Sequence, residues 1–286
     1  MSEQIEGEEN KEPAEFASGE STGQVFGFYM NQLAVLEDLT ESPEINCAPD
    51  RISSLYPLLF SLRFTGLSIS ILARHGCLNE CFMLARAFLE RLINYIYLLF
   101  CDEDEYLRYL AHTKQKGFRL LNRSIKAGDL RAELKWLGSI DLSKERELKE
   151  AIDLFTSQKG REITRWTSVQ LSDRLGVIAE KGGIEIGPLM FSLLGLYQDA
   201  SEALHGTLYG SIFHIGVFTR ELPSSRSELG KIYNEQFSML FFMLGVCIGS
   251  LVKAIDRIVP IGELKKRSTE DIHTVSNGKW LPKTDK

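Results

Sequence analysis

Apolar residues recur with helical spacing along most of the chain, from about residue 24 to residue 259. Two-residue alternation, which is typical of strands, is hardly present, and no Asn-Gly or Asp-Gly turn separates strand-like runs. The sequence therefore predicts an all-α fold, a single multi-helix domain of about eight to ten helices. The predicted helices are Gln24–Leu39, Ile52–Arg74, Leu78–Phe100, Tyr106–Lys126, Leu130–Leu137, Ser143–Ser157, Val169–Glu180, Pro188–Tyr209 and Leu229–Val259.

The negative charge of the chain is concentrated at its amino-terminal end. Residues 1–22 hold seven Glu and one Lys, a charge of −6, which equals the formal net charge of all 286 residues. Subtracting them from 33 basic and 39 acidic residues leaves 32 of each, so the rest of the chain is neutral and is no strongly basic nucleic-acid coat protein. We expect a disordered acidic tail over 1–22, a helical domain over 23–262 and a polar carboxyl-terminal tail over 263–286.

The five cysteines are few and odd in number, which is typical of packed thiols in a reducing cytosol. Cys77 and Cys81 are one helical turn apart, but zinc needs two further ligands, and no second Cys or His pair has the required spacing. We therefore expect no metal and no cofactor. The acidic, polar start of the chain lacks the pattern of a secretory signal, so we expect a cytoplasmic protein.

Gln236–Val252 is an uncharged run of 17 residues that is rich in Phe, Met and Leu. Its length is at the lower limit for a membrane-spanning helix, which needs about 20 apolar residues. A central helix of a large helical domain has the same composition. We favour the buried helix, with a membrane span as the alternative. Gly245 and Gly249 would permit close helix approach in either case.

Three polar residues interrupt the apolar run Leu78–Phe100. Arg86, Glu90 and Asn94 fall at i, i+4 and i+8, so they form one slanted stripe on a helix. Arg and Glu are almost never fully buried unless they are paired. The stripe therefore either lines a functional cleft or is an Arg86–Glu90 ion pair that joins helices.

A second polar set has the same spacing further along the chain, where Tyr197, Ser201 and His205 fall four residues apart. His205 is a candidate general acid/base, because the unperturbed pKa of histidine, about 6.5, allows proton transfer near neutrality. Glu202 lies within one turn and is expected to orient His205, while Gly206 would allow close approach of a ligand or backbone. The alternative is a structural histidine in the core, whose ring nitrogens form hydrogen bonds within the protein.

One face of the predicted helix Tyr106–Lys126 is basic, and residues 109–128 contain no acid. Such a stripe can follow the phosphates of RNA or another phosphate-bearing ligand. The alternative is a solvated face balanced by the acidic segments Asp102–Glu105 or Glu145–Glu150. The members of the face are Arg108, His112, Lys116, Arg119, Arg123 and Lys126, of which Lys116, Arg119 and Arg123 are the candidate ligand contacts.

Three motifs follow one another in the chain. Residues 84–99 read LxRxxxExxINxxYLL, a Trp loop with Trp166 precedes a helix with Gly176, and a Tyr-x-x-x-Ser-x-x-x-His segment ends at His205. In this order, across residues 52–215, they resemble a family of bacterial all-helical domains of unknown function.

The architecture more distantly resembles the HEPN helical proteins, which include RNA-cleaving toxins, defence effectors and inactive binding members. This resemblance implies a homodimer, and the apolar helix 229–258 fits such pairing. HEPN nucleases carry an Arg-x(4–6)-His motif, and His205 has no Arg at that spacing. A HEPN-like site would need its Arg from another helix, and Arg86 is the candidate.

Three functions follow. In the first, slightly favoured, the chain is a metal-independent RNA-processing, toxin or defence domain, with His205 as general acid/base and Arg86 stabilising phosphate charge. Glu202 or Glu90 would assist the histidine, and Asn94, Tyr197 and Ser201 would contact the substrate. In the second, the Arg86–Glu90–His205 cluster is structural and the chain is a non-catalytic interaction or sensor module. In the third, the chain is a membrane-associated effector through residues 236–252.

Overall fold

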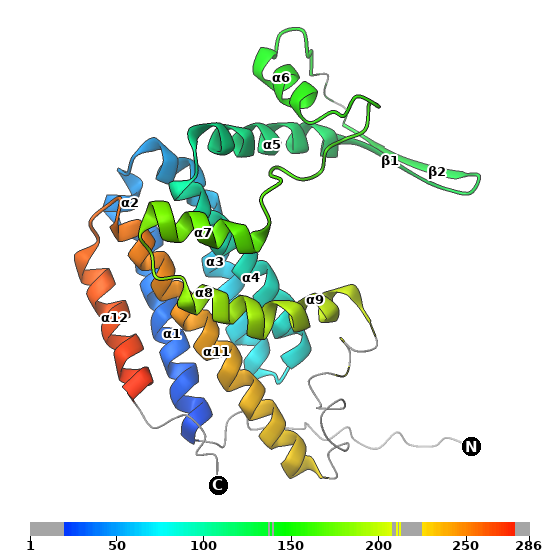
Figure 1. Cartoon of the computed structure of the whole chain (residues 1–286). Coiled ribbons are helices and arrows are strands. Elements are labelled where there is room, and N and C mark those ends of the chain that lie inside the picture. Colours follow the sequence, from blue (N-terminus) through cyan, green and yellow to red (C-terminus); the bar gives the residue numbers. More distant parts are fainter. Residues whose placement is uncertain are drawn as a thin grey trace, which may run out of the picture. The chain divides into compact units, whose positions relative to one another are not determined.

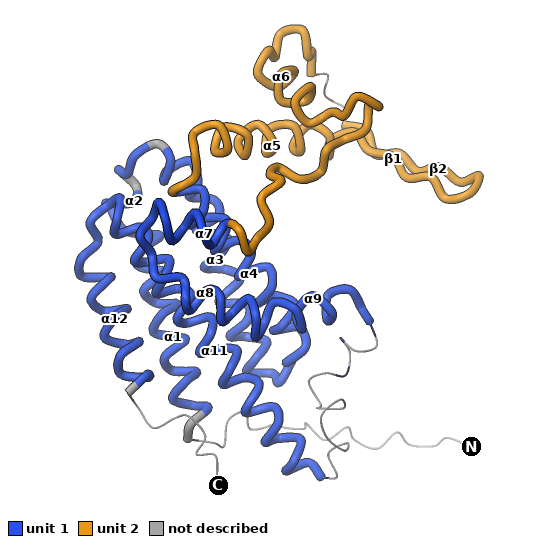
Figure 2. Tube along the Cα trace, viewed as in Figure 1, with its two compact units in different colours: residues 1–99, 174–286 blue, residues 100–173 orange. Residues whose placement is uncertain are grey.

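The computed structural model of the chain describes residues 20–136, 138, 140–207, 210, 212 and 225–277. Within them, regular structure is helical apart from one two-stranded sheet and one isolated bridge, which confirms the predicted all-α class (Figure 1). The expected helical domain contains two compact units, unit 1 (residues 1–99 and 174–286) and unit 2 (residues 100–173) (Figure 2). Residues 1–19 of the predicted acidic tail lie outside the described residues, and residues 20–22 begin the first helix.

Unit 1 is a body of packed helices. Helices α1, α11 and α12 lie side by side, and α8 packs on α11 (Figure 1). Its interior is apolar: the buried residues of α4 and of the second half of α11 are nearly all apolar. The helices wholly or mostly in unit 1 are α1 (Glu20–Glu41), α2 (Pro43–Asn46), α3 (Asp50–Arg74), α4 (Leu78–Phe100), α7 (Leu171–Gly182), α8 (Gly187–Ser192), the π-helical turn η1 (Leu193–Tyr197), α9 (Gln198–His205), α11 (Arg226–Asp256) and α12 (Gly262–Asn277).

Two glycines let α11 approach its neighbours. A Cβ at Gly245 would lie 2.3 Å from the ring of Phe28 on α1. A Cβ at Gly249 would lie 2.3 Å from the Cδ1 atom of Ile272 on α12. Both separations are too short for carbon atoms in contact, so a larger residue would push the helices or side chains apart. The predicted close approach at these two positions is confirmed.

Among the described residues, two helices are long and apolar enough to cross a membrane by length and composition: Arg51–Arg74 and Arg226–Asp256. The apolar window of the second is 78% buried inside the protein, against 33% for the first. The run Gln236–Val252 belongs to this second helix, and all its residues from Met243 onward are buried. Because core helices of soluble proteins pass the same test, this burial supports the interpretation as a core helix.

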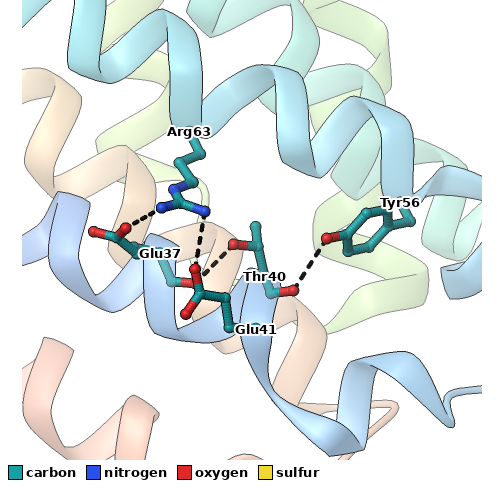
Figure 3. A network of polar contacts seen from close by, with 5 residues as sticks. All are labelled: Glu37, Thr40, Glu41, Tyr56 and Arg63. Carbon is teal, nitrogen blue, oxygen red and sulfur yellow. Dashed lines mark hydrogen bonds and ion pairs between the residues drawn. The ribbon is translucent and has the colours of Figure 1, made fainter.

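A network of polar side chains joins α1 to α3 (Figure 3). Arg63 pairs with Glu37 and donates to Glu41 Oε1 at 3.2 Å. The Tyr56 hydroxyl donates to the carbonyl of Thr40 at 3.2 Å. The last carbonyls of a helix have no partner within that helix, so Tyr56 satisfies one of them at the end of α1.

Unit 2 is smaller and more open. Its helix α6 packs on α5, and a β-hairpin follows α5 directly. All twelve hairpin residues are exposed. Its elements are α5 (Glu103–Leu121), β1 (Asn122–Ala127), β2 (Leu130–Lys135) and α6 (Arg146–Leu154).

The hairpin corrects two helix predictions. The predicted helix Tyr106–Lys126 ends at Leu121, and the predicted helix that begins at Leu130 is strand β2. The strands pair antiparallel, with Ala127 opposite Leu130 beside the turn. Gly128 in this turn has φ +61°, a left-handed conformation that glycine adopts readily and that two-residue hairpin turns require.

The carboxyl-terminal end also differs from the prediction. Residues 263–286, predicted as a polar tail, include α12, which packs on α1 and α11. Two buried polar residues hold this contact: the Ser268 hydroxyl donates to Gln32 Oε1 at 2.7 Å, and Gln32 Nε2 donates to the Ser268 carbonyl at 3.1 Å. Residues 278–286 lie outside the described part of the chain.

Candidate functional site

The polar stripe predicted on α4 lies at the surface of unit 1. Arg86, Glu90 and Asn94 occupy partly exposed positions on a helix whose other positions are mostly buried. The side chain of Arg86 is 19% exposed and that of Glu90 is 41% exposed. Solvent and a ligand can therefore reach these groups, which are not sealed in a dry core.

The second polar set comes from η1 and α9. Tyr197 ends the π-helical turn, and π-helical turns occur frequently at functional sites. Ser201 and His205 follow on α9, with His205 as the last helical residue. Gly206 has φ +65° and ends the helix, whereas a Cβ there would meet nothing within 4 Å. Glycine is therefore needed there for the left-handed backbone, and the approach of a ligand to Gly206 stays a prediction.

Arg86 is the centre of the cluster. Its Nη1 atom lies 3.4 Å from Nε2 of His205, although the two residues are 119 positions apart. Its Nε atom lies 3.7 Å from Oε1 of Glu90, and its guanidinium carbon lies 5.1 Å from the centre of the Tyr197 ring. Arginine only donates hydrogen bonds, so in this contact Nε2 of His205 is the acceptor. The structure thus brings Arg86, Glu90 and His205 together.

Glu90 is held from two sides. The Tyr197 hydroxyl donates to Oε1 of Glu90, the carboxylate oxygen that faces Arg86. Burial and, next, this hydrogen bond raise the pKa of Tyr197, against a smaller opposing effect of Arg86. Tyr197 therefore stays protonated at neutral pH and fixes the carboxylate beside the guanidinium.

Asn94 has a partner that the sequence did not indicate. Arg174 of α7 donates through Nη1 to the Asn94 side-chain oxygen, and its guanidinium lies 5.8 Å from the centre of the Tyr97 ring. The signal was weak, because Arg174 is one basic residue on a short amphipathic helix. Arg174 adds a second guanidinium to the polar surface, one helical turn from Glu90.

Ser201 and Glu202 do not act on His205 in this arrangement. The Ser201 hydroxyl donates to the Tyr197 carbonyl at 2.7 Å, a bond within the helix. Glu202 Oε2 accepts from the Thr207 hydroxyl at 2.9 Å, just beyond the end of α9. The expected Glu202–His205 pair is therefore replaced by a contact that closes the end of the helix.

The basic residues of α5 bond to unit 2 itself. Arg108 Nε donates to the Trp166 carbonyl at 2.8 Å, and its guanidinium carbon lies 4.8 Å from the centre of the Phe155 ring. His112 Nε2 donates to the Thr164 carbonyl at 3.0 Å. Burial lowers the pKa of His112, so its ring is neutral at pH 7. These two residues fasten the loop before α7 to α5.

Of the three candidate ligand contacts, Lys116 and Arg119 lie on α5, whereas Arg123 lies beyond its end. Lys116 pairs with Glu162 at 2.6 Å and holds the pKa of that carboxyl below its usual range. Arg119 Nη2 donates to the Thr156 hydroxyl at 2.6 Å. Arg123 lies on β1, because α5 has already ended. The prediction of one basic helical face that continues to Lys126 is wrong, since the chain changes from helix to strand.

Three of the five cysteines, Cys81, Cys101 and Cys247, are buried and form no disulfide, whereas Cys47 is exposed. Cys81 is buried with its sulfur 3.5 Å from the Ile69 carbonyl, and burial raises the pKa of this thiol to about 12. Cys77, one turn earlier, is partly exposed. Across the described ranges, no group of three or more His, Cys, Asp or Glu side chains is placed to hold a metal ion.

Comparison with known proteins identifies the family of the chain. No curated protein and no solved structure matches it significantly. Residues 56–221 match a family of unknown function (DUF5677), a range that covers more than half of the chain and includes both Arg86 and His205. The motifs that suggested an all-helical family of unknown function lie in nearly the same range, whereas the HEPN relationship and the bacterial origin stay predictions. The chain therefore belongs to the family of unknown function DUF5677.

Proposed function

We propose that the protein is a metal-independent RNA-processing domain of the toxin or defence type, with its site at Arg86 and His205. One observation carries this proposal: the 3.4 Å contact between Arg86 Nη1 and His205 Nε2 at the surface of unit 1. A guanidinium beside an imidazole supplies anion stabilisation and proton transfer, the two contributions that phosphodiester cleavage requires.

RNA carries its own nucleophile in the 2′-hydroxyl, so this reaction needs no metal-bound water. His205 takes the 2′ proton on Nε2 as that oxygen attacks phosphorus. The bond from phosphorus to the 5′ oxygen breaks, and the imidazolium returns the proton to this leaving oxygen. The products are a 2′,3′-cyclic phosphate and a 5′-hydroxyl. Arg86 donates to the phosphate oxygens whose charge grows in the transition state.

Substrate entry requires an exchange of hydrogen bonds. In the free protein, Arg86 occupies the Nε2 lone pair of His205. A phosphate inserted between them accepts from Arg86 and leaves this lone pair free for the 2′-hydroxyl. Glu90 and Tyr197 hold the guanidinium during the exchange and are positioning residues. The site therefore becomes active as a base only when an anion is bound.

The surface beside the cluster suits an RNA strand. Asn94 lies one turn further along α4, and Arg174 of α7, which bonds to it, offers a guanidinium for a neighbouring phosphate. Lys116 and Arg119 have no role in this proposal, because their bonds within unit 2 already occupy them. The free cysteines suit a reducing cytoplasm.

The test is cleavage of a 5′-labelled single-stranded RNA by the purified full chain in the presence of a metal chelator. We expect fragments that end in a cyclic phosphate, and a rate at least about 100-fold lower for His205→Ala. His273→Ala is the matched control, because His273 is exposed on α12 of the same unit. No cleavage by the wild type, or equal cleavage by His205→Ala, would overturn the proposal.

A second candidate is a non-catalytic interaction or sensor module. It is favoured by the pairing of Glu90 with Tyr197 and of Asn94 with Arg174, because both bonds tie other helices to α4. In that case the wild type cleaves no RNA, and Glu90→Ala lowers the melting temperature as much as His205→Ala does. Under the first proposal, His205→Ala changes the rate and leaves the melting temperature nearly unchanged.

A further inference from the structure

One face of the β-hairpin of unit 2 is apolar, and its large side chains are exposed within the described part of the chain. Residues that pair across an antiparallel ladder lie on the same face, so alternate positions of both strands share a side. Ile125, Leu130, Leu134 and Trp136 lie on one such side, and they are 70%, 79%, 52% and 60% exposed. A two-stranded hairpin is only marginally stable in water unless further strands or another element cover it.

The outer edge of β2 offers unpaired backbone groups at known positions. The Trp136 amide donates to the Leu121 carbonyl at 2.9 Å, so Trp136 directs its backbone amide toward the first strand. Residues that bond to the neighbouring strand alternate with residues that face away from it. Residues 130, 132, 134 and 136 therefore bond to β1, while 131, 133 and 135 direct their amides and carbonyls outward. A strand added to β2 would pair with Arg131, Glu133 and Lys135.

Two copies of this edge can pair so that opposite charges face each other. If two copies of β2 pair antiparallel around Ala132, Arg131 of each copy faces Glu133 of the other as a hydrogen-bonded pair. The same register brings Lys135 of each copy toward Asp129 of the other. Opposite charges directly across a ladder stabilise pairing, and like charges oppose it.

Neighbouring registers are disfavoured by the same charges. A shift that centres the pair on Arg131 puts arginine opposite arginine and Asp129 opposite Glu133. A shift in the opposite direction centres the pair of strands on Glu133 and puts Arg131 of one copy opposite Lys135 of the other. A shift by one residue would place the apolar face of one hairpin beside the polar face of the other. The edge of β1 holds two cations, Arg123 and Lys126, and no acid, so it repels a copy of itself.

We propose that a second copy of this chain docks on the β2 edge, so that two hairpins form one four-stranded antiparallel sheet centred on Ala132. In the single chain, Glu133 pairs with both Arg131 and Lys135 of its own strand. In the dimer it faces Arg131 of the second copy, and Lys135 is released toward the partner's turn. Leu130 then lies beside Leu134 of the second copy, which covers part of the apolar face. This inference does not depend on the proposed function.

The test measures the mass of the full chain in solution by light scattering. The wild type should show twice the 32.4 kDa chain mass. Arg131→Glu and Glu133→Arg should each weaken the dimer at least about tenfold, because each puts two like-charged pairs across the new ladder. Mixing the two variants should restore a dimer, since each variant then faces its complement. This rescue separates a lost interface from a hairpin that fails to fold.

Lys126→Glu is the matched control. It changes the charge by the same amount as Arg131→Glu. Lys126 lies opposite Arg131 on the same side of the hairpin, but on β1, so the dimer mass should stay unchanged. A monomeric wild type would overturn the proposal. So would a dimer that persists in both single variants, because the two copies would then meet through another surface.

Discussion

Units 1 and 2 each hold an arginine that lies over an aromatic ring together with a histidine, but the two Arg–His pairs bond differently. In unit 1, Arg86 and His205 contact each other at the surface. In unit 2, Arg108 and His112 each donate to a backbone carbonyl of the loop before α7. Basic residues at helical spacing can therefore form a site or fasten a loop, and only their bonding partners distinguish the two.

The units also differ in what stabilises them. Unit 1 buries a continuous set of apolar side chains from α1, α3, α4 and α11. In unit 2, α5 has two buried residues and the hairpin has none. Hydrophobic burial therefore dominates the stability of unit 1, whereas hydrogen bonds and ion pairs contribute a larger share in unit 2.

The largest expected effect comes from a core truncation. Phe88 on α4 is fully buried, so Phe88→Ala should lower the free energy of unfolding by about 3–5 kcal/mol. Ile125→Ala on the hairpin, at a position 70% exposed, should change the stability of a monomeric chain by less than about 0.5 kcal/mol. Chemical denaturation measures both. Similar losses for the two variants would remove the contrast between the units.

A smaller effect is expected for Arg119 in unit 2. Its guanidinium bonds to Gln115, Thr156 and the Ile152 carbonyl, so Arg119→Ala should cost unit 2 about 1–3 kcal/mol. Hydrogen exchange should become faster in α5 and α6 and stay unchanged in α4. Arg146→Ala is the control, because the Arg146 side chain is 89% exposed and forms an exposed ion pair with Glu150. Unchanged exchange in Arg119→Ala would show that these bonds do not stabilise the unit.

Tyr197→Phe should have a smaller effect still on stability. It removes the hydrogen bond to Glu90 but keeps the ring under Arg86, so the expected loss is about 0.5–1.5 kcal/mol. Thermal unfolding measures this loss. Ser201→Ala is the control, since it removes only a hydroxyl bond within α9. A loss as large as that of Phe88→Ala would make the cluster a core element.

The smallest effect is the pH dependence of unit 2. Burial, reinforced by Lys116, lowers the pKa of His112 below its usual value near 6.5, against the Thr164 hydrogen bond. A depressed histidine pKa contributes stability that is present above pH 6.5 and is lost as pH falls through the folded-state pKa. Exchange in the loop of residues 156–166 should therefore accelerate on acidification. His112→Gln should remove this acceleration, and an unchanged pH profile would contradict the account.

The sequence predicted the long helices but missed the hairpin. α4 and α11 carry strong apolar patterns, and their bounds were close to those predicted. Residues 122–135 contain Lys, Arg, Leu and Glu, which favour helices, so the sequence predicts helices on both sides of Gly128. Gly128 and Asp129 form a Gly-Asp pair, which is a hairpin-turn signal and agrees with the observed turn. The sequence showed little sign of α12 because its composition is polar, and its side-chain bonds to α1 come from polar residues, Arg267 and Ser268.

The sequence predicted which residues belong to the candidate site but not which of them bond to each other. Spacing placed Arg86, Glu90 and Asn94 on one face of a helix, and the structure agrees. It could not show that Glu90 bonds to Tyr197 or that Asn94 bonds to Arg174, because these pairs join different helices. Such contacts depend on helix packing, which one sequence does not specify.

The most direct test of this comparison is RNA cleavage by His205→Ala and His112→Ala in parallel. His205→Ala should abolish cleavage while unit 1 keeps its stability. His112→Ala should keep the wild-type rate, because His112 only bonds to the Thr164 carbonyl and packs against Phe155. Equal rates for both variants, or a loss of cleavage only in His112→Ala, would contradict the assignment of the site to Arg86 and His205.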